Sequence, residues 1–214
     1  KVFIKAGAAV SSDTDFTITA ASTIDSTVTD NTTLRIEKVL SAGVDIATSG
    51  KLAGNDNATE SDATGADDDE ETTKDGIAPG ATQEFAVQVG NMRPIDQTAD
   101  GTADETTTVA DTYNLTYEKL GAASSFIVQL YNDLDGDGEL DENELVQISD
   151  TGWLPAIEDV SGTIAADDPG VFNLIVRVQV PKGTPAGDYF IKVTATSTNN
   201  DDVEDSMHIL VRVN

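Results

Sequence analysis

The chain has 214 residues, with 39 acidic and 12 basic side chains and a formal net charge of −27. This charge excludes nucleic acid as a partner, because phosphate binding requires a basic surface, and it disfavours anionic membrane surfaces. The sequence contains no cysteine, which excludes disulfides and thiolate metal sites, and no apolar run of about 18 residues that would predict membrane insertion.

The first 32 residues are expected to form an N-terminal extension. Residues 2–10, VFIKAGAAV, are apolar and strand-prone, and a second strand is expected at residues 16–22. A strand at the start of the chain can pair with its own domain, or it can add to an open sheet edge of a second copy. Strand 2–10 is therefore a candidate for self-assembly into a homopolymer, because head-to-tail addition that does not close produces a filament.

Residues 33–214 are expected to form one domain built almost entirely of strands. Apolar residues alternate with polar ones along much of this region, and no segment has a convincing helical period. The predicted strands cover residues 33–40, 84–91, 112–120, 124–133, 171–181, 188–197 and 205–214. Turn sequences such as PKGTPAGD separate them, so the predicted fold class is an all-β, antiparallel β-sandwich.

Two polar tracts, residues 54–76 and 96–108, interrupt this pattern as long acidic loop insertions. Composition alone predicts that both are flexible. Ordering such a segment costs about 1 to 2 kcal/mol per residue in backbone entropy, so cations or a neighbouring subunit would have to compensate. The acidic insert 54–76 is expected to be either a solvated loop held by packing or a second calcium site. That second site would use some of Asp67, Asp68, Asp69, Glu70 and Glu71.

The run DLDGDGELDENE, residues 133–144, has the spacing of a twelve-residue calcium loop. Such loops place oxygen ligands at positions one, three, five, seven, nine and twelve, with glycine at position six for the sharp turn. Gly138 occupies position six. The predicted metal ligands are the backbone carbonyl of Glu139 and the side chains of Asp133, Asp135, Asp137, Asp141 and Glu144. The sequence therefore predicts a bound calcium ion, and the alternative is an acidic hairpin loop that stays solvated.

The segments around this loop predict strands on both sides. Residues 124–133 alternate in polarity before it, and residues 145–149, LVQIS, follow it. In calcium sensors the loop lies between two helices that open when the ion binds. An ion between two strands has no helix pair to open. We therefore expect calcium to stabilise the fold through linkage to binding, in a structural role.

From Thr33 onward the chain resembles the conserved-repeat, immunoglobulin-like domains of bacterial and archaeal cell-surface proteins. The likeness rests on LRIEKVL, IAPGATQEFAVQVGN, the DLDGDGELD loop and, most specifically, the PKGTPAGDYFIKVTATS turn and strand. It covers about four fifths of the chain, and it implies an immunoglobulin-like sandwich at the cell surface with no chemistry attached. The insert 54–76 and the extension 1–32 depart from the family.

The residues needed for catalysis are not evident. Hydrolytic triads need a histidine general base, and the single histidine, His208, falls on the polar phase of the last strand as an expected exposed residue. Acids are too abundant for any pair to indicate glycoside hydrolysis. The single tryptophan, Trp153, could stack on a sugar, although packing in a core or loop is the commoner role. We expect that the protein is not an enzyme.

These features predict a secreted calcium-binding structural protein that forms an extracellular filament, pilus or surface layer by β-strand addition. Strong self-repulsion destabilises a compact acidic fold unless cations bind it, which favours calcium-rich surroundings outside the cell. The alternative is a calcium-stabilised module for cell-surface adhesion or carbohydrate binding. In that alternative, Trp153 and the loops at the end of the sandwich would hold a glycan or surface ligand.

Overall fold

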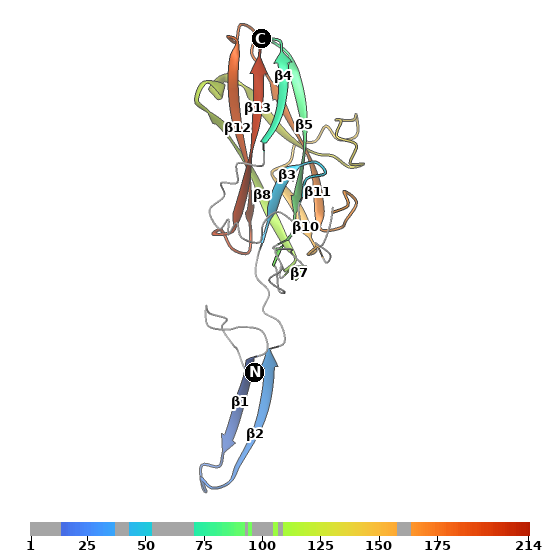
Figure 1. Ribbon diagram of the computed structural model, residues 1–214. Coiled ribbons are helices and arrows are strands. Elements are labelled where there is room, and N and C mark those ends of the chain that lie inside the picture. Colours follow the sequence, from blue (N-terminus) through green and yellow to red (C-terminus); the bar gives the residue numbers. More distant parts are fainter. Residues whose placement is uncertain are drawn as a thin grey trace. The chain divides into compact units, whose positions relative to one another are not determined.

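The structure is a computed structural model that describes residues 14–36, 43–52, 71–92, 94–95, 105–106, 109–157 and 164–214 (Figure 1). The chain divides into two compact units, Lys1–Ser41 and Ala42–Asn214. The expected boundary between residues 32 and 33 therefore lies inside the first unit. None of the described residues belongs to a helix that is long and apolar enough to cross a membrane.

The described part of the first unit is a β-hairpin. Strand β1 (Thr14–Ala21) pairs antiparallel with β2 (Thr29–Ile36), with Thr14 opposite Ile36 and Ala21 opposite Thr29. Residues 33–36 are therefore held by β1, which corrects the prediction that residues 33–40 form the opening strand of the sandwich. The expected strand 16–22 corresponds to β1. The other expected strand of this unit, residues 2–10, lies outside the described residues.

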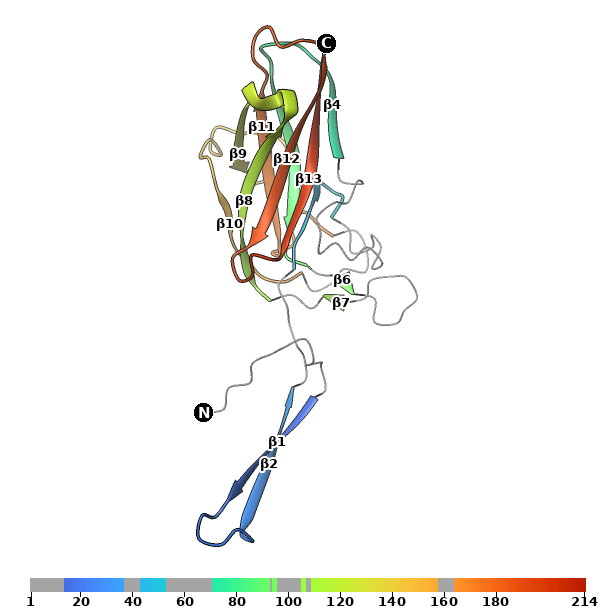
Figure 2. The same ribbon diagram turned by 90° about the vertical axis from the view of Figure 1, so that its left-hand side faces the viewer.

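The second unit is a sandwich of two β-sheets (Figures 1 and 2). One sheet has the order β10-β8-β12-β13-β4 and the other β3-β5-β11-β9. The strands are β3 (Asp45–Thr48), β4 (Glu71–Ile77), β5 (Thr82–Gly90), β8 (Asp111–Leu120), β9 (Ile127–Asn132), β10 (Asp150–Leu154), β11 (Val171–Gln179), β12 (Gly187–Ser197) and β13 (Glu204–Val213). Every pairing within these two sheets is antiparallel except that of β4 with β13. The prediction of an all-β, antiparallel immunoglobulin-like sandwich is confirmed.

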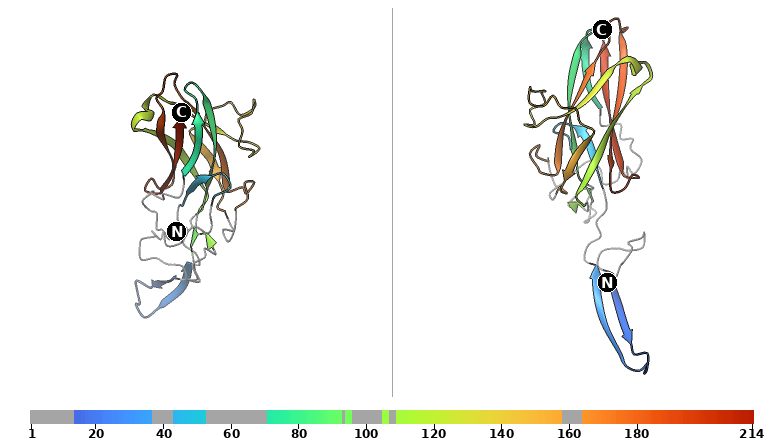
Figure 3. Two further views of the ribbon diagram at one scale, coloured as in Figure 1. Left: turned by 45° about the horizontal axis from the view of Figure 1, so that its top comes forward. Right: turned by 180° about the vertical axis from the view of Figure 1, so that it is seen from behind.

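The main core lies between the two sheets, which Figure 3 shows from two further directions. Alternate residues of each long strand point into it, because successive side chains of a strand face opposite sides of the sheet. Leu174 and Val176 of β11 and Ile191 and Val193 of β12 are all fully buried. Each such side chain contributes about 1.5 to 3 kcal/mol relative to an exposed position. The period-two pattern in the sequence is therefore the signature of this core.

The end of the first acidic tract is a strand and not a loop. Residues 71–77 form β4, which runs parallel to β13 with Thr72 opposite Ile209 and Lys74 opposite Val211. Ile77 at its end is 3% exposed and belongs to the core. Composition missed this strand because hydrogen bonds to β13 hold a polar segment extended. Residues 67–70, candidates for a second calcium site, lie outside the described residues.

Three smaller elements complete the described chain. Strands β6 (Pro94–Ile95) and β7 (Glu105–Thr106) pair within and beside the second acidic tract, and a short 3-10 helix, η1 (Gly121–Ser125), joins β8 to β9. Residues 145–149 do not form the expected regular strand, because only Gln147 forms a bridge, with Tyr131. His208 is half-buried and not fully exposed, since it lies between β12 and β4 in the sheet.

Candidate metal centre

The candidate metal loop, residues 133–144, leaves the edge of the β3-β5-β11-β9 sheet and returns to it. At its start the amide of Asp133, directly after β9, donates to the carbonyl of Asn173 on β11 at 3.1 Å. After its end the amide of Ile148 donates to the carbonyl of Leu130 on β9 at 3.0 Å. Both ends of the loop are therefore anchored to the same sheet edge.

Two glycines allow the loop to lie against the outer face of that sheet. Gly136 and Gly138 have φ angles of +73° and +82°, in the region that favours glycine. A Cβ atom on Gly138 would lie 3.2 Å from the Cβ of Ala86 on β5, and one on Gly136 would lie 3.2 Å from Asn173 Nδ2. Ile175 is paired with Ala86 and points to the outer face of the sheet, because its neighbours Leu174 and Val176 face the core, yet it is fully buried. The loop therefore packs closely on β5 and β11.

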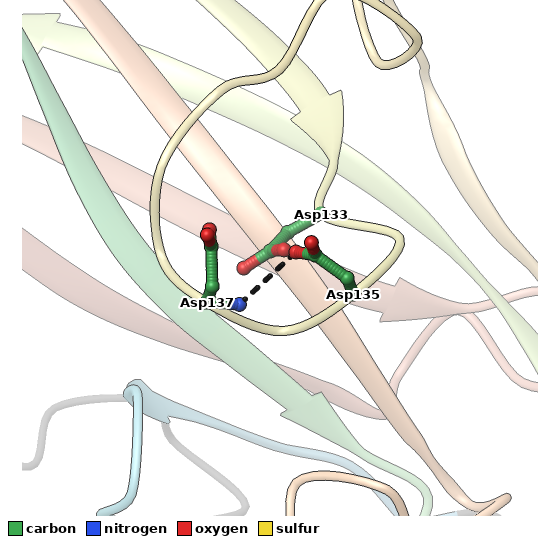
Figure 4. A group of neighbouring side chains, drawn as sticks. All are labelled: Asp133, Asp135 and Asp137. Carbon is green, nitrogen blue, oxygen red and sulfur yellow. Dashed lines mark hydrogen bonds between the residues drawn. The ribbon is translucent and has the colours of Figure 1, made fainter.

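Three of the predicted ligands converge inside the loop (Figure 4). One carboxylate oxygen from each of Asp133, Asp135 and Asp137 lies within 4.8 Å of the others. Local hydrogen bonds set this arrangement, because each carboxylate accepts an amide two or more residues further on. Asp133 accepts from Gly136 at 2.7 Å and Gly138 at 3.0 Å. Asp135 accepts from the amide of Asp137 at 3.3 Å, and Asp137 from that of Glu139 at 2.8 Å.

Glu144 closes the loop from its last position. Its side chain is 3% exposed, and its two carboxylate oxygens accept the amides of Leu134 at 2.6 Å and Asp141 at 3.0 Å. Glu144 and Asp141 are not members of the 4.8 Å group, and the side chain of Asp141 is exposed. The structure thus brings together three of the five predicted side-chain ligands and holds a fourth, Glu144, buried at the closure of the loop. The carbonyl of Glu139 remains a predicted ligand.

The loop concentrates negative charge in a partly buried place. Asp133 is only 5% exposed, and burial raises its pKa, against the hydrogen bonds from Gly138 and Gly136 and together with the charges of Glu144 and Asp135. Desolvation also raises the pKa of Asp141, with further contributions from neighbouring carboxylates. In the described part of the chain, no lysine or arginine forms an ion pair with this loop. A buried carboxylate without a counter-charge destabilises the fold.

The donor set fits a hard divalent cation. Every candidate ligand offers oxygen, which calcium and magnesium prefer, whereas zinc sites use histidine or cysteine. The buried carboxylates of Asp133 and Glu144, which have no cationic partner among the described residues, are the feature that such an ion would neutralise. The residues present therefore fit a calcium ion chemically.

Sequence reasoning missed the polar residues behind the loop. Asn173 accepts the Asp133 amide through its carbonyl, and its side-chain Oδ1 accepts from Gln88 Nε2 at 2.8 Å. Gln88, 1% exposed, also accepts the amide of Gly50 through Oε1 at 2.8 Å. The available signal was a polar residue between apolar neighbours in each of two strands, Gln88 between Val87 and Val89 and Asn173 between Phe172 and Leu174. These contacts connect the loop to β11, β5 and the turn after β3.

A second buried carboxylate, Asp111, lies at the start of β8 and is 1% exposed. It accepts from the hydroxyl of Ser197, from the hydroxyl of Thr198 at 3.2 Å and from the amide of Thr112 at 2.7 Å. Nearby, the hydroxyl oxygen of Tyr113 lies 2.8 Å from Asn91 Oδ1. Burial, with the charge of Asp111, raises the pKa of Tyr113. This group was not predicted from the sequence.

Trp153 lies on β10 and is 70% exposed, so the expectation that it packs in a core or loop is wrong. It occupies an edge strand, opposite Thr112 of β8. It is the largest exposed apolar side chain among the described residues.

Comparisons with known proteins give only distant similarity. No family model and no curated protein sequence matches the chain. Among solved structures, a family 123 glycoside hydrolase from Clostridium perfringens is 10% identical, with a TM-score of 0.36, and the match covers 81% of this chain but only 27% of that enzyme. A human PapD-like domain is 14% identical, with a TM-score of 0.31, over 82% of this chain and 87% of that one. A type I cohesin from Pseudobacteroides cellulosolvens is 11% identical, with a TM-score of 0.25, over 67% and 91%.

Proposed function

We propose that the chain is a calcium-binding structural module of an extracellular protein, with no catalytic role. The observation that carries this proposal is the metal loop, where buried Asp133 and Glu144 lack a cationic partner among the described residues while Asp135 and Asp137 converge on Asp133. Calcium held by the six predicted ligands would neutralise these charges. Because the loop packs on β5 and β11, ion binding would stabilise the sheet through linkage.

Calcium binding can be tested by calorimetric titration and by thermal unfolding with calcium or EGTA. We expect saturable binding and a higher melting temperature with calcium. Glu144→Gln should weaken both effects, because it removes the charge that closes the loop. Asp202→Asn is the matched control, since Asp202 is an exposed acid in the turn between β12 and β13. An unchanged melting temperature in EGTA would contradict the proposed role.

In the same proposal, copies of the chain assemble into a filament, pilus-like fibre or surface layer through strand 2–10. The hairpin of the first unit supports an assembly role for this region. Ile24, Val28 and Leu34 are 97%, 60% and 39% exposed, and a two-stranded hairpin alone is at best marginally stable in water. Contact with a further sheet would stabilise it.

Electron microscopy of the purified protein, with and without calcium, tests the assembly. We expect polymers in calcium and their loss when residues 1–10 are deleted, because the deletion removes the strand that would join one copy to the next. The calcium titration of the shortened chain is the control for a folded sandwich. Polymers that survive the deletion would show that strand 2–10 does not join the copies.

A second candidate function is an adhesion or carbohydrate-binding module, and the exposure of Trp153 favours it. An exposed indole ring can stack on the apolar face of a sugar. Binding of a panel of soluble oligosaccharides should then be lost in Trp153→Ala. Val146→Ala, at an aliphatic side chain that is 75% exposed, is the control. A protein that binds sugars equally well in both variants would not be using Trp153.

A further inference from the structure

Among the described residues, strand β5 is paired along only part of one edge. On one side β11 pairs with it from Thr82 to Gly90. On the other side β3 pairs only with residues 87–90. The chain then turns away, with the amide of Ser49 donating to the carbonyl of Ala86 at 3.1 Å and the amide of Lys51 to that of Thr48 at 2.9 Å. Among the described residues no strand therefore pairs with residues 82–86 of β5 on this side, and Figure 1 shows β3 beside one end of β5 only.

At this edge the carbonyls of Glu84 and Ala86 already accept hydrogen bonds, from Lys74 and from Ser49, so two amides and not these carbonyls are left for pairing. The amide of Val180 donates to the carbonyl of Ala81, so the odd-numbered residues of this segment face β11 and the even-numbered ones face the open side. The amides of Thr82 and Glu84 have no hydrogen-bond partner among the described residues. Unpaired edge amides of this kind are a template for a further strand.

One lysine covers this edge in place of a strand. Lys74 of β4 donates its ammonium group to the carbonyl of Glu84, and the same group lies 5.3 Å from the centre of the Phe85 ring. Phe85 is only 1% exposed, although no strand from the described part of the chain pairs with it on this side. A charged side chain at a sheet edge discourages indiscriminate pairing. The hydrogen bond from Lys74 to the Glu84 carbonyl therefore occupies this edge, and a strand that pairs with Glu84 would displace it.

We propose that this open edge of β5 accepts residues 2–10 of a second copy as an added strand. The inference rests on the proposed assembly and adds the place where the donated strand binds. Nine extended residues span about 30 Å, which exceeds the length of the five-residue edge. Residues 1–10 carry two lysines and no acid, whereas the chain as a whole has 39 acidic side chains against 12 basic ones. The donor is thus a basic, apolar segment in a chain of net charge −27.

Because the chain contains no cysteine, single cysteines can report the contact. One preparation carries Glu84→Cys, and others carry Val2→Cys, Ile4→Cys, Ala6→Cys or Ala8→Cys in turn. Pairs of preparations are mixed in calcium and oxidised. We expect a disulfide-linked dimer for at least one donor position, because paired strands bring facing residues within disulfide range. Ile127→Cys on β9, at the opposite edge of the same sheet and 53% exposed, is the control acceptor and should not cross-link.

The other outcomes overturn the inference in distinguishable ways. Polymers that cross-link through Ile127→Cys but not Glu84→Cys would leave the assembly intact and refute this acceptor edge. Cross-linking of Glu84→Cys to Leu34→Cys, and not to the donor series, would identify the hairpin as the occupant. A link that forms only when both cysteines are in one monomeric chain would show pairing in cis. If no polymer forms under any condition, the proposed assembly fails together with its acceptor.

Discussion

The sandwich contains two sites with buried carboxylates, and the surroundings of the buried negative charge differ between them. Asp111 accepts hydrogen bonds from the hydroxyls of Ser197 and Thr198 as well as from a backbone amide. Asp133 accepts from backbone amides only among the described residues, and a carboxylate oxygen of it lies within 4.8 Å of those of Asp135 and Asp137. Asp111 is thus surrounded by hydrogen-bond donors, whereas Asp133 lies in a cluster of carboxylates.

This difference indicates that the protein's own donors stabilise the Asp111 carboxylate, whereas the Asp133 carboxylate depends on an added positive charge. Neutral donors satisfy Asp111 within the protein, so its contribution to folding should not depend on metal. Burial raises the pKa of Asp133 in spite of two amide donors, which means that the metal-free loop disfavours its ionised form. The contrast between Asp111 and Asp133 can therefore be tested directly.

The largest expected effect is the loss of calcium-linked stability in Asp133→Asn. A ligand present at about one hundred times its dissociation constant stabilises the native state by about 2.7 kcal/mol, and this variant should lose most of that gain. Urea unfolding with calcium and with EGTA measures it. Asp111→Asn should keep the full calcium response. If both variants respond to calcium like the unmodified protein, the distinction between the two sites is wrong.

The next effect is a loss of stability in Asp111→Asn that is independent of calcium. Replacing the carboxylate misaligns the donors of Ser197 and Thr198, and an unsatisfied buried polar group costs about 1 to 3 kcal/mol. The unfolding free energy should fall equally in calcium and in EGTA. A loss that appears only in EGTA would mean that the two sites are coupled.

A smaller effect is expected from Gly138→Ala in the metal loop. The left-handed backbone costs about 1 kcal/mol for alanine, and its Cβ would press against the Cβ of Ala86 at 3.2 Å. Gly183→Ala is the matched control, because Gly183 has nearly the same φ, +83°, with nothing within 4 Å of the added atom. Unfolding free energies that fall equally in both variants would show that close packing of the loop on β5 does not matter.

The smallest effect is a pH dependence of the metal-free protein. The pKa of Asp133 is raised in the folded state, so the folded form binds a proton more readily than the unfolded form. In EGTA its contribution to stability therefore increases as the pH falls from neutral through the raised pKa. Because other acids titrate too, the measured quantity is the difference between the melting curves of the unmodified protein and Asp133→Asn. If the two pH profiles are parallel, Asp133 does not contribute.

Much of the sandwich was predictable from local pattern. The strands around Leu174, Ile191 and Ile209 were predicted because their buried positions alternate with less buried ones, so that apolar residues recur at every second position. Strand β4 was missed, because Thr72 and Lys74 are polar and are held in a strand by pairing with β13. The hairpin partner of β1 was assigned to the wrong unit, since pairing between strands is not visible in the composition of either one.

The candidate site was likewise predictable only in part. The spacing from Asp133 to Asp137 predicted three carboxylates that converge, and they do. Nothing in that spacing indicated Asn173 and Gln88 behind the loop, or the contact of Gly138 with Ala86, because these residues come from strands distant in the sequence. Trp153 was expected to pack, yet it is 70% exposed while its neighbour Leu154 on β10 is buried.

The sequence by itself determined the all-β class, the faces that enter the core and the three carboxylates that converge in the candidate metal loop, because each follows from the spacing of neighbouring residues along one segment. Only the tertiary structure decided which sheet the loop covers, which buried acid is surrounded by donors and where the pairing of β3 with β5 stops. Those features depend on which distant strands pair and where each pairing stops, and that is set by the packing of the whole sandwich.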